Sequence, residues 1–187
     1  MLSSTRNSIF TDDGFLFSKV LDFSEFSNFD CGNDDLNDFI RNDAGRHQSE
    51  LMAETYSFSY EKAPILPFAF VSLSNDTIRW RGSQIQMDTI PEGLRYTELP
   101  AVKIGRLGVR KEYQCKDVGT ALINLVKELF RRENRTGCRF ITVDAYNEEP
   151  VLRFYRKNGF DYYHERDVSK RTRIMFFDLK TFVLPED

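Results

Sequence analysis

The 187-residue sequence predicts a mixed α/β domain, and three observations carry this prediction. Apolar and polar residues alternate from Ala101 to Val109, which is typical of a β-strand. The segment Val118–Arg132 repeats apolar residues at helical spacing. From Ala101 onward, strand-like and helix-like segments follow in the order strand, helix, strand, helix, strand, strand. A helix between two strands predicts at least one crossover connection.

The N-terminal half is harder to divide into elements. Residues 1–14 are polar and are expected to be loosely ordered. A helix is predicted from about residue 34 to 46, because Asn33 or Asp34 can cap its start and apolar residues follow at helical spacing. The composition of residues 74–98 is the least interpretable, and a short helix there is left open. Strands are predicted over three ranges: Gly14–Leu21, Ala53–Tyr60 and Pro67–Leu73.

The C-terminal half has clearer boundaries. A second helix is predicted over Glu149–Lys157, and Asn158-Gly159 is a typical C-terminal stop. Three further strands complete the half: Phe140–Tyr146, Phe160–His164 and Thr172–Leu179. Neither a repeat nor a linker-like stretch interrupts the sequence, so a single domain over residues 1–187 is expected.

Composition excludes several classes of protein. Hydrophobic residues make up 41% and charged residues 29%, which argues against disorder. The longest uncharged apolar run, Ala63–Val71, contains two prolines and is too short to cross a bilayer, so no membrane partner is expected. The first residues lack the pattern of a secretory signal. Three separated cysteines suit a reducing cytoplasm, and two histidines without a Cys-x-x-Cys pair predict no metal site.

The formal net charge of −3 hides an asymmetry. Residues 1–100 contain 8 Lys and Arg against 16 Asp and Glu, whereas residues 101–187 contain 18 against 13. The difference can reflect ordinary solvated faces, or the second half can hold an anionic ligand. Neither half has the strong positive excess of a dedicated nucleic-acid binder.

The junction between the strand ending near Arg110 and the helix opening near Val118 is a candidate anion site. The first backbone N–H groups of a helix have no partners within the helix and lie at the positive end of its dipole. Such a turn can bind a phosphate or diphosphate. Gly119 permits close approach, Thr120 adds a hydroxyl, and Lys116 adds a positive charge.

Three blocks together resemble the GCN5-related N-acetyltransferases (GNAT superfamily). Gln114-Cys-Lys-Asp-Val-Gly119 is similar to the coenzyme-binding loop of that family, and Ile104-Gly-Arg-Leu-Gly-Val to the strand before it. Arg153-Phe-Tyr-Arg-Lys-Asn-Gly-Phe160 resembles the family's Phe-Tyr-x-x-x-Gly-Phe signature. The blocks occupy about residues 100–165 in the family's order. Two further segments, Phe29–Ile40 and Leu99–Val109, resemble the subgroup that includes toxins acetylating aminoacyl-tRNA.

The resemblance implies a GNAT fold, with a central mixed, mostly antiparallel sheet flanked by helices. It implies acetyl transfer from acetyl-CoA to a primary amine by direct attack, without a metal. Tyr155 is the implied general acid, because a phenol with a reference pKa near ~10 is protonated at neutral pH; the alternative is an aromatic core residue. The implied coenzyme-binding residues are Leu107, Gly108, Val109, Gln114, Cys115, Lys116, Asp117, Val118, Gly119, Thr120 and, more weakly, Asn147.

Asp117 departs from the family pattern, because it stands where the pattern has its first glycine. A carboxylate there would repel a diphosphate unless it points to solvent or caps the helix, and we expect one of these arrangements. The general base is left open among Glu98, Asp144 and a water chain.

Three functions remain open from the sequence. The first is an N-acetyltransferase acting on a small-molecule or protein amine. The second is a toxin of a toxin–antitoxin pair that acetylates aminoacyl-tRNA, with tRNA and an antitoxin as partners. The third is a non-catalytic acyl-CoA-binding module, for which Asp117 is the hint. A homodimer is common in the family, and neither the oligomeric state nor the acceptor can be read from motifs that locate only the coenzyme.

Overall fold

The computed structural model describes residues 8–10, 14–80, 83–85, 96–132 and 136–184. The chain divides into two compact units, one comprising Met1–Ser74 and Gly105–Leu125, the other Asn75–Ile104 and Val126–Asp187. The boundaries between the units fall within strands β4 (Ala69–Arg79) and β5 (Glu98–Val109) and helix α3 (Val118–Arg132). We call the units unit 1 and unit 2 and describe each by itself.

Unit 1 contains the strand order β1-β2-β3-β4-β5. Strands β1 (Ser8–Phe10), β2 (Phe15–Lys19) and β3 (Glu54–Tyr60) pair antiparallel, as do β3 and β4. The helical stretch that follows β2 in sequence consists of α1 (Asp34–Asp38), a π-helical turn over Phe39–Asp43 and α2 (Ala44–Ser49). Its apolar side chains join a core with residues from other parts of the unit, namely Val20, Phe26, Phe29, Cys31, Phe39, Ile40, Ala44 and Phe70.

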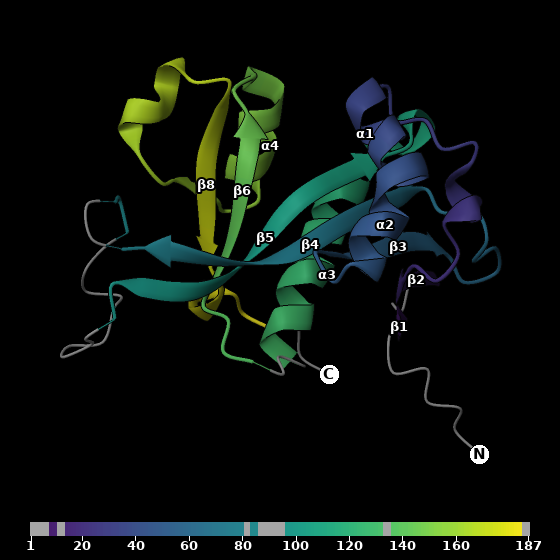
Figure 1. The fold of residues 1–187 in the computed structure, drawn as a ribbon, viewed down its shortest axis with the longest axis horizontal. Coiled ribbons are helices and arrows are strands. Elements are labelled where there is room, and N and C mark those ends of the chain that lie inside the picture. Colours follow the sequence, from purple (N-terminus) through teal and green to yellow (C-terminus); the bar gives the residue numbers. More distant parts are fainter. Residues whose placement is uncertain (1–7, 11–13, 81–82, 86–95, 133–135, 185–187) are drawn as a thin grey trace. The chain divides into compact units, whose positions relative to one another are not determined.

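Unit 2 has the strand order β4-β5-β6-β8-β7. Strand β6 (Phe140–Tyr146) lies parallel to β5 and antiparallel to β8 (Thr172–Asp178), while β7 (Asp161–Tyr162) pairs with β8. Figure 1 shows β6 and β8 side by side, with α4 (Glu149–Lys157) next to β6. The apolar core of this unit includes Ile78, Trp80, Ile85, Leu99, Ala101, Phe140 and Phe176.

These elements confirm the predicted fold class, a mixed and mostly antiparallel sheet with flanking helices. Helices α3 and α4 have the predicted bounds, and the parallel pairing of β5 with β6 confirms a crossover that α3 connects. Gly159 ends α4 with φ +79°, as Asn158-Gly159 predicts, whereas Gly14, predicted as the first residue of a strand, lies before β2 with φ +75°.

Several boundaries were predicted wrongly. The predicted helix near residues 34–46 continues to Ser49 and contains a π-helical turn. Strand β4 extends to Arg79, six residues past its predicted end, because the polar stretch Ser74–Thr77 also has strand conformation. Residues 8–10, expected to be loosely ordered, form β1 by pairing with β2. Strand β7 is only two residues long.

Two expectations are left untested by these elements. The short helix left open for residues 74–98 lies partly outside the described residues, and a single domain over residues 1–187 stays a prediction. A search of the helices in the described part of the chain finds none whose length and apolar character would suit a membrane span.

Candidate active site

The last residues of β5 extend beyond its pairing with β6. The parallel register runs from Ala101, opposite Phe140, to Ile104, opposite Val143. Residues 105–109 continue the strand within unit 1, with β4 as the neighbouring strand. The described pairings therefore give this segment no partner strand on its second edge, where an extended ligand could form strand-like hydrogen bonds. The segment contains the predicted coenzyme residues Leu107, Gly108 and Val109.

Gly108 is required by the packing of this segment. A Cβ atom at position 108 would lie 2.5 Å from Cε1 of Phe70, well inside van der Waals contact. Phe70 is fully buried in the core of unit 1, so its ring has little room to move. By contrast, a Cβ at Gly105 would meet only the Ser72 carbonyl oxygen, at an ordinary 3.6 Å.

The connection from β5 to α3, residues 110–117, has an unusual backbone; we call it the β5–α3 loop. It begins with a 3₁₀ turn over Lys111–Tyr113. Cys115 and Asp117 then adopt left-handed conformations, with φ of 58° and 57°. Asp117 thus has the backbone conformation for which glycine is favoured, although it carries a side chain. Its side chain is exposed and its carbonyl accepts the Ala121 N–H at 2.9 Å, which starts α3.

The start of α3 presents backbone donors. Among the described residues, no acceptor is recorded for the N–H groups of Val118, Gly119 and Thr120. These donors lie at the positive end of a 15-residue helix. Lys116 is exposed and its ammonium lies 5.8 Å from the centre of the Tyr113 ring. This arrangement is suited to binding phosphate oxygens.

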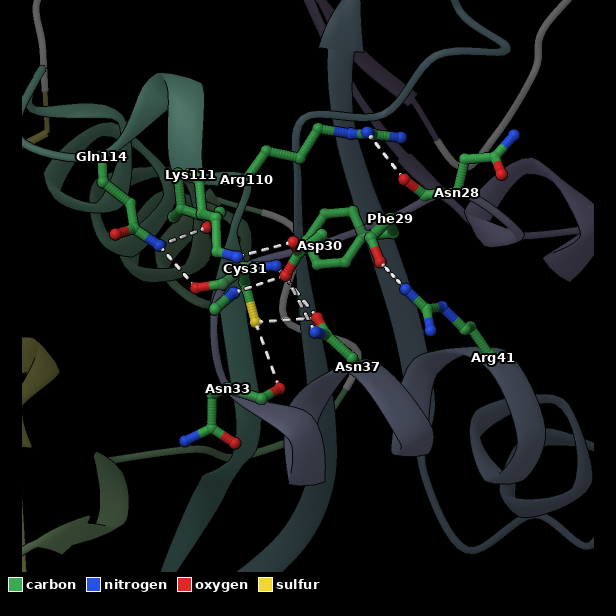
Figure 2. Close-up of polar contacts among 12 residues, drawn as sticks. Asn28, Phe29, Asp30, Cys31, Asn33, Asn37, Arg41, Arg110, Lys111 and Gln114 are labelled. Carbon is green, nitrogen blue, oxygen red and sulfur yellow. Dashed lines mark hydrogen bonds and ion pairs between the residues drawn. The ribbon is translucent and has the colours of Figure 1, made fainter.

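Gln114 has an unexpected role for a residue of the predicted coenzyme motif. Its side-chain amide donates hydrogen bonds to the carbonyl oxygens of Cys31, at 2.7 Å, and Val109, at 2.8 Å (Figure 2). The side-chain nitrogen therefore holds the loop to the end of β5 and to an N-terminal segment. Arg110 and Lys111 also bind this N-terminal segment. Sequence reasoning missed these contacts and the part that Arg110 and Lys111 take in them.

Tyr155 lies in unit 2, on the inner side of α4. Its side chain is buried between Phe154 and Phe160, with ring centroids at 5.1 and 5.3 Å. Burial raises the pKa of its phenol, so the group stays protonated throughout the neutral range. Among the described residues no hydrogen-bond partner of this hydroxyl is recorded. A protonated phenol of this kind can donate a proton.

Asn147 uses its side-chain amide nitrogen within unit 2. This nitrogen donates to the carbonyl oxygens of Val168 and Lys170, both at 2.8 Å, and so fixes the connection between β7 and β8. Of the side-chain polar atoms, only the oxygen remains to contact a coenzyme. A coenzyme role for Asn147 stays a prediction.

Both carboxylates considered as general bases lie in ion pairs. Glu98 accepts from Arg79 at 2.8 Å, and Asp144 lies 2.5 Å from the Lys103 ammonium. An ion-paired carboxylate can still accept a proton, so Glu98, Asp144 and a water chain all stay open as the general base. Within the described part of the chain, no three His, Cys, Asp or Glu side chains are grouped as metal ligands would be.

Comparison with known proteins agrees with this geometry. Residues 82–162 match the family model of the acetyltransferase (GNAT) domain, a range that includes β5, the β5–α3 loop and Tyr155. Among solved structures, a tyrosine-to-phenylalanine mutant of KacT has a TM-score of 0.73 and 21% identity, covering 90% of this chain and 96% of that one. AtaT complexed with acetyl-methionyl-tRNAfMet has a TM-score of 0.69 and 19% identity, covering 89% of this chain and 96% of that one.

A third structure, AtaTR bound with acetyl-CoA, has a TM-score of 0.68 and 20% identity, covering 90% of this chain and 96% of that one. At these identities the structures establish a shared fold, and the family model adds a match in sequence over residues 82–162. Both findings agree with the resemblance of the three sequence blocks to the GNAT superfamily. The chain therefore has the fold of these structures, and its residues 82–162 match the acetyltransferase (GNAT) domain in sequence.

Proposed function

We propose that this protein is an N-acetyltransferase that moves an acetyl group from acetyl-CoA to a primary amine. The observation that carries the proposal is the junction of β5 and α3, inside the segment that matches the GNAT domain. There, the N–H groups of Val118, Gly119 and Thr120 have no recorded acceptor among the described residues, and a left-handed backbone leads into them. These donors fit the diphosphate of a coenzyme.

In this proposal, different residues of the junction bind different parts of the coenzyme. Backbone groups of Leu107, Gly108 and Val109 bind the pantetheine arm as an added strand would. The N-terminus of α3, with the Thr120 hydroxyl and the Lys116 ammonium, binds the diphosphate. One backbone N–H of the β5 segment also stabilises the oxyanion that develops on the thioester carbonyl.

The chemical step in the proposal needs one base and one acid. The neutral amine attacks the carbonyl carbon, the C–S bond breaks, and the amine proton leaves through water. Tyr155 donates its phenolic proton to the departing thiolate and is reprotonated from solvent. Burial raises the pKa of this phenol, so Tyr155 carries its proton at neutral pH.

A second, narrower candidate is the amino group of an aminoacyl-tRNA as acceptor. The support is the fold, since a similar structure is that of AtaT with acetyl-methionyl-tRNAfMet, and another is a complex of KacTA with DNA. The net positive charge of residues 101–187 fits a polyanionic acceptor. With this acceptor, we also propose an antitoxin partner and a homodimer. A cytoplasmic location is part of the same proposal, because the three cysteines are free thiols, which suits a reducing compartment.

Calorimetric titration with acetyl-CoA tests the coenzyme part of the proposal. We expect saturable binding to one site per chain. Dephosphorylated and desulfo analogues should bind more weakly, because each lacks a group that contributes to the affinity. A chain that binds no acetyl-CoA would contradict the proposal. Binding without release of thiol towards any amine would instead indicate the non-catalytic module.

The acceptor is tested by offering two substrates side by side. Purified protein is incubated with radiolabelled acetyl-CoA and either charged tRNA or a panel of amines and peptides. Label on charged tRNA, with growth arrest when the protein is induced in cells, would support the narrower candidate. Label on an amine alone, without growth arrest, would exclude it and leave the broader function intact.

A further inference from the structure

The β5–α3 loop is held by a short segment far away in the sequence, residues 28–31, which we call the 28–31 segment. Its four successive backbone carbonyl groups all accept hydrogen bonds from side chains or backbone outside the segment (Figure 2). Three of the four donors belong to the β5–α3 loop: Arg110 Nη1 to Asn28 at 3.0 Å, Lys111 N–H to Asp30 at 3.1 Å, and Gln114 Nε2 to Cys31 at 2.7 Å. Three of the four carbonyl groups thus bind the loop, and the fourth, that of Phe29, accepts from Arg41.

Asp30 is the centre of this contact. One carboxylate oxygen lies 2.7 Å from the Lys111 ammonium, and the other accepts from the Gly32 N–H at 2.8 Å and from Asn37 at 3.0 Å. Lys111, Gly32 and Asn37 together hold the pKa of Asp30 down to about 2, so the carboxylate is charged at neutral pH. Gly32 has φ +80°, and a Cβ there would lie 2.9 Å from the Lys111 Cε. Glycine at this position therefore leaves room for the lysine.

The 28–31 segment is itself anchored in the core of unit 1. Phe29 is fully buried, packs against Phe26 and Phe70, and lies 5.3 Å from the Arg110 guanidinium. The buried Asn37 side chain accepts the Cys31 N–H at 2.9 Å, which ties the segment to α1. The segment is therefore a fixed support rather than a second flexible loop.

The loop needs such a support, because few hydrogen bonds lie within it. The recorded backbone bonds inside it are Tyr113 N–H to Arg110 and Gln114 N–H to Lys111. Two of its non-glycine residues, Cys115 and Asp117, are in left-handed conformations, which are unfavourable for a residue with a side chain unless the surroundings stabilise them. Contacts from outside the loop must offset that cost.

We propose that the 28–31 segment is a clamp that fixes the β5–α3 loop in its coenzyme-binding conformation, with Asp30 as its positioning residue. The clamp rests on the proposed function, because it acts on the site assigned to acetyl-CoA. It gives a physical role to part of the block Phe29–Ile40 that resembles the toxin subgroup. Asp30 acts through Lys111 and the loop backbone, and no contact between Asp30 and the coenzyme is required.

Asp30→Ala tests the clamp, because two explanations of its effect have opposite signs. If Asp30 acts only through its charge, removing a carboxylate near a diphosphate site tightens acetyl-CoA binding. If it is a clamp, the loop becomes less ordered, and we expect Kd and KM for acetyl-CoA to rise roughly tenfold with kcat changed less than twofold. Lys111→Ala is less informative, since its ammonium could also touch phosphate.

Glu54→Ala is the matched control, because Glu54 and Lys19 form another partly exposed ion pair in unit 1, on β3 and β2. It should leave acetyl-CoA binding unchanged. Hydrogen exchange of the amides of residues 111–119, measured without coenzyme, adds a readout that does not depend on activity. The clamp predicts faster exchange there in Asp30→Ala than in Glu54→Ala.

The outcomes separate the clamp from the proposed function. Unchanged or tighter binding by Asp30→Ala, or unchanged loop exchange, overturns the clamp. Wild-type protein that binds no acetyl-CoA overturns the proposed function, and loop exchange alone then decides the clamp. If Asp30→Ala fails to fold, Asp30→Asn takes its place. It keeps an acceptor for Gly32 and loses the ion pair, so an intermediate rise in Kd and exchange supports the clamp, and no change contradicts it.

Discussion

The β5–α3 loop in unit 1 and helix α4 in unit 2 carry candidate site residues of opposite kinds. The loop leads into the backbone N–H groups of Val118, Gly119 and Thr120, whereas α4 carries a buried side chain, the phenol of Tyr155. A site made of backbone depends on conformation and tolerates many side chains. A site made of one side chain depends on that chemical group and on the packing that isolates it. The two regions should therefore respond differently to substitution.

Removing one oxygen atom from α4 should have the largest effect. We expect Tyr155→Phe to lower kcat about 100-fold, because general acid catalysis typically contributes that much or more, with little change in Kd for acetyl-CoA. The aromatic packing against Phe154 and Phe160 is kept, so the melting temperature should change little. Steady-state thiol release and calorimetry measure the two quantities.

Tyr162→Phe is the control for this substitution, since Tyr162 lies in β7 of the same unit and is only partly buried. It should keep wild-type kcat. Full activity of Tyr155→Phe would remove Tyr155 from the mechanism. Because its pKa is raised by burial, wild-type kcat should also show no alkaline loss attributable to this phenol below about pH 10.

The C-terminal end of α4 is close to a second buried polar side chain, Lys127 of α3. Its ammonium donates to the Asn158 carbonyl at 2.8 Å and lies 4.0 Å from the centre of the Phe177 ring. Burial lowers the pKa of Lys127 from 10.5 to about 8. The folded protein then loses this proton before the unfolded chain does, so the free energy of unfolding should rise between pH 8 and 10.5.

The expected rise is about 2–3 kcal/mol, and Lys127→Met should abolish it while leaving the remaining pH dependence unchanged. Urea unfolding of both proteins at pH 7.5, 9 and 10.5 measures it. Parallel pH profiles for wild type and variant would show that Lys127 is charged or neutral to the same extent in both states. Lys180→Met is a suitable comparison, because Lys180 is exposed.

Gly108→Ala tests the backbone-built side of the comparison. The added methyl group would collide with the buried Phe70 ring, and we expect a loss of about 1–2 kcal/mol in the free energy of unfolding. The shift of β5 should also weaken acetyl-CoA binding. Gly105→Ala on the same strand meets only the Ser72 carbonyl at 3.6 Å and should be nearly neutral. Equal effects of the two substitutions would contradict the packing argument.

The helices α3 and α4 were predictable from sequence because their signals are local. Apolar residues at helical spacing mark α3, and Asn158-Gly159 marks the end of α4. The end of β4 was not predictable, because the polar stretch Ser74–Thr77 contains no alternation, and its strand conformation comes from pairing with neighbouring strands. Strand β1 likewise exists through its pairing with β2.

The candidate site was predictable to a similar, partial extent. The motif around Gln114 and Gly119 located the anion-binding junction, and the Phe-Tyr signature drew attention to Tyr155. The contacts of the loop with the 28–31 segment could not be predicted, because the bonded residues are more than 80 positions apart. Sequence spacing predicts contacts only between residues of one helix or strand. The contacts of Asp30 with the loop could therefore be found only in the structure.

Asp117→Gly should have the smallest effect of these substitutions. Asp117 holds a left-handed φ of 57° at the position where the family pattern has glycine, and its side chain is exposed. Glycine removes the steric cost of that conformation and adds flexibility to the unfolded chain, so the net gain in the free energy of unfolding should be only about 0.5–1 kcal/mol. Acetyl-CoA binding should be unchanged or tighter, since a carboxylate next to the diphosphate site is lost as well.

Lys116→Gly separates these two contributions, because Lys116 is its neighbour in the same loop but is not among the residues with positive φ. It gains nothing from the backbone freedom of glycine and should lose stability slightly. A large loss of acetyl-CoA affinity in Asp117→Gly, measured by calorimetry, would mean that its carboxylate takes part in shaping the loop. The β5–α3 loop would then depend on a particular side chain, as α4 depends on Tyr155. The contrast between the two regions would not hold.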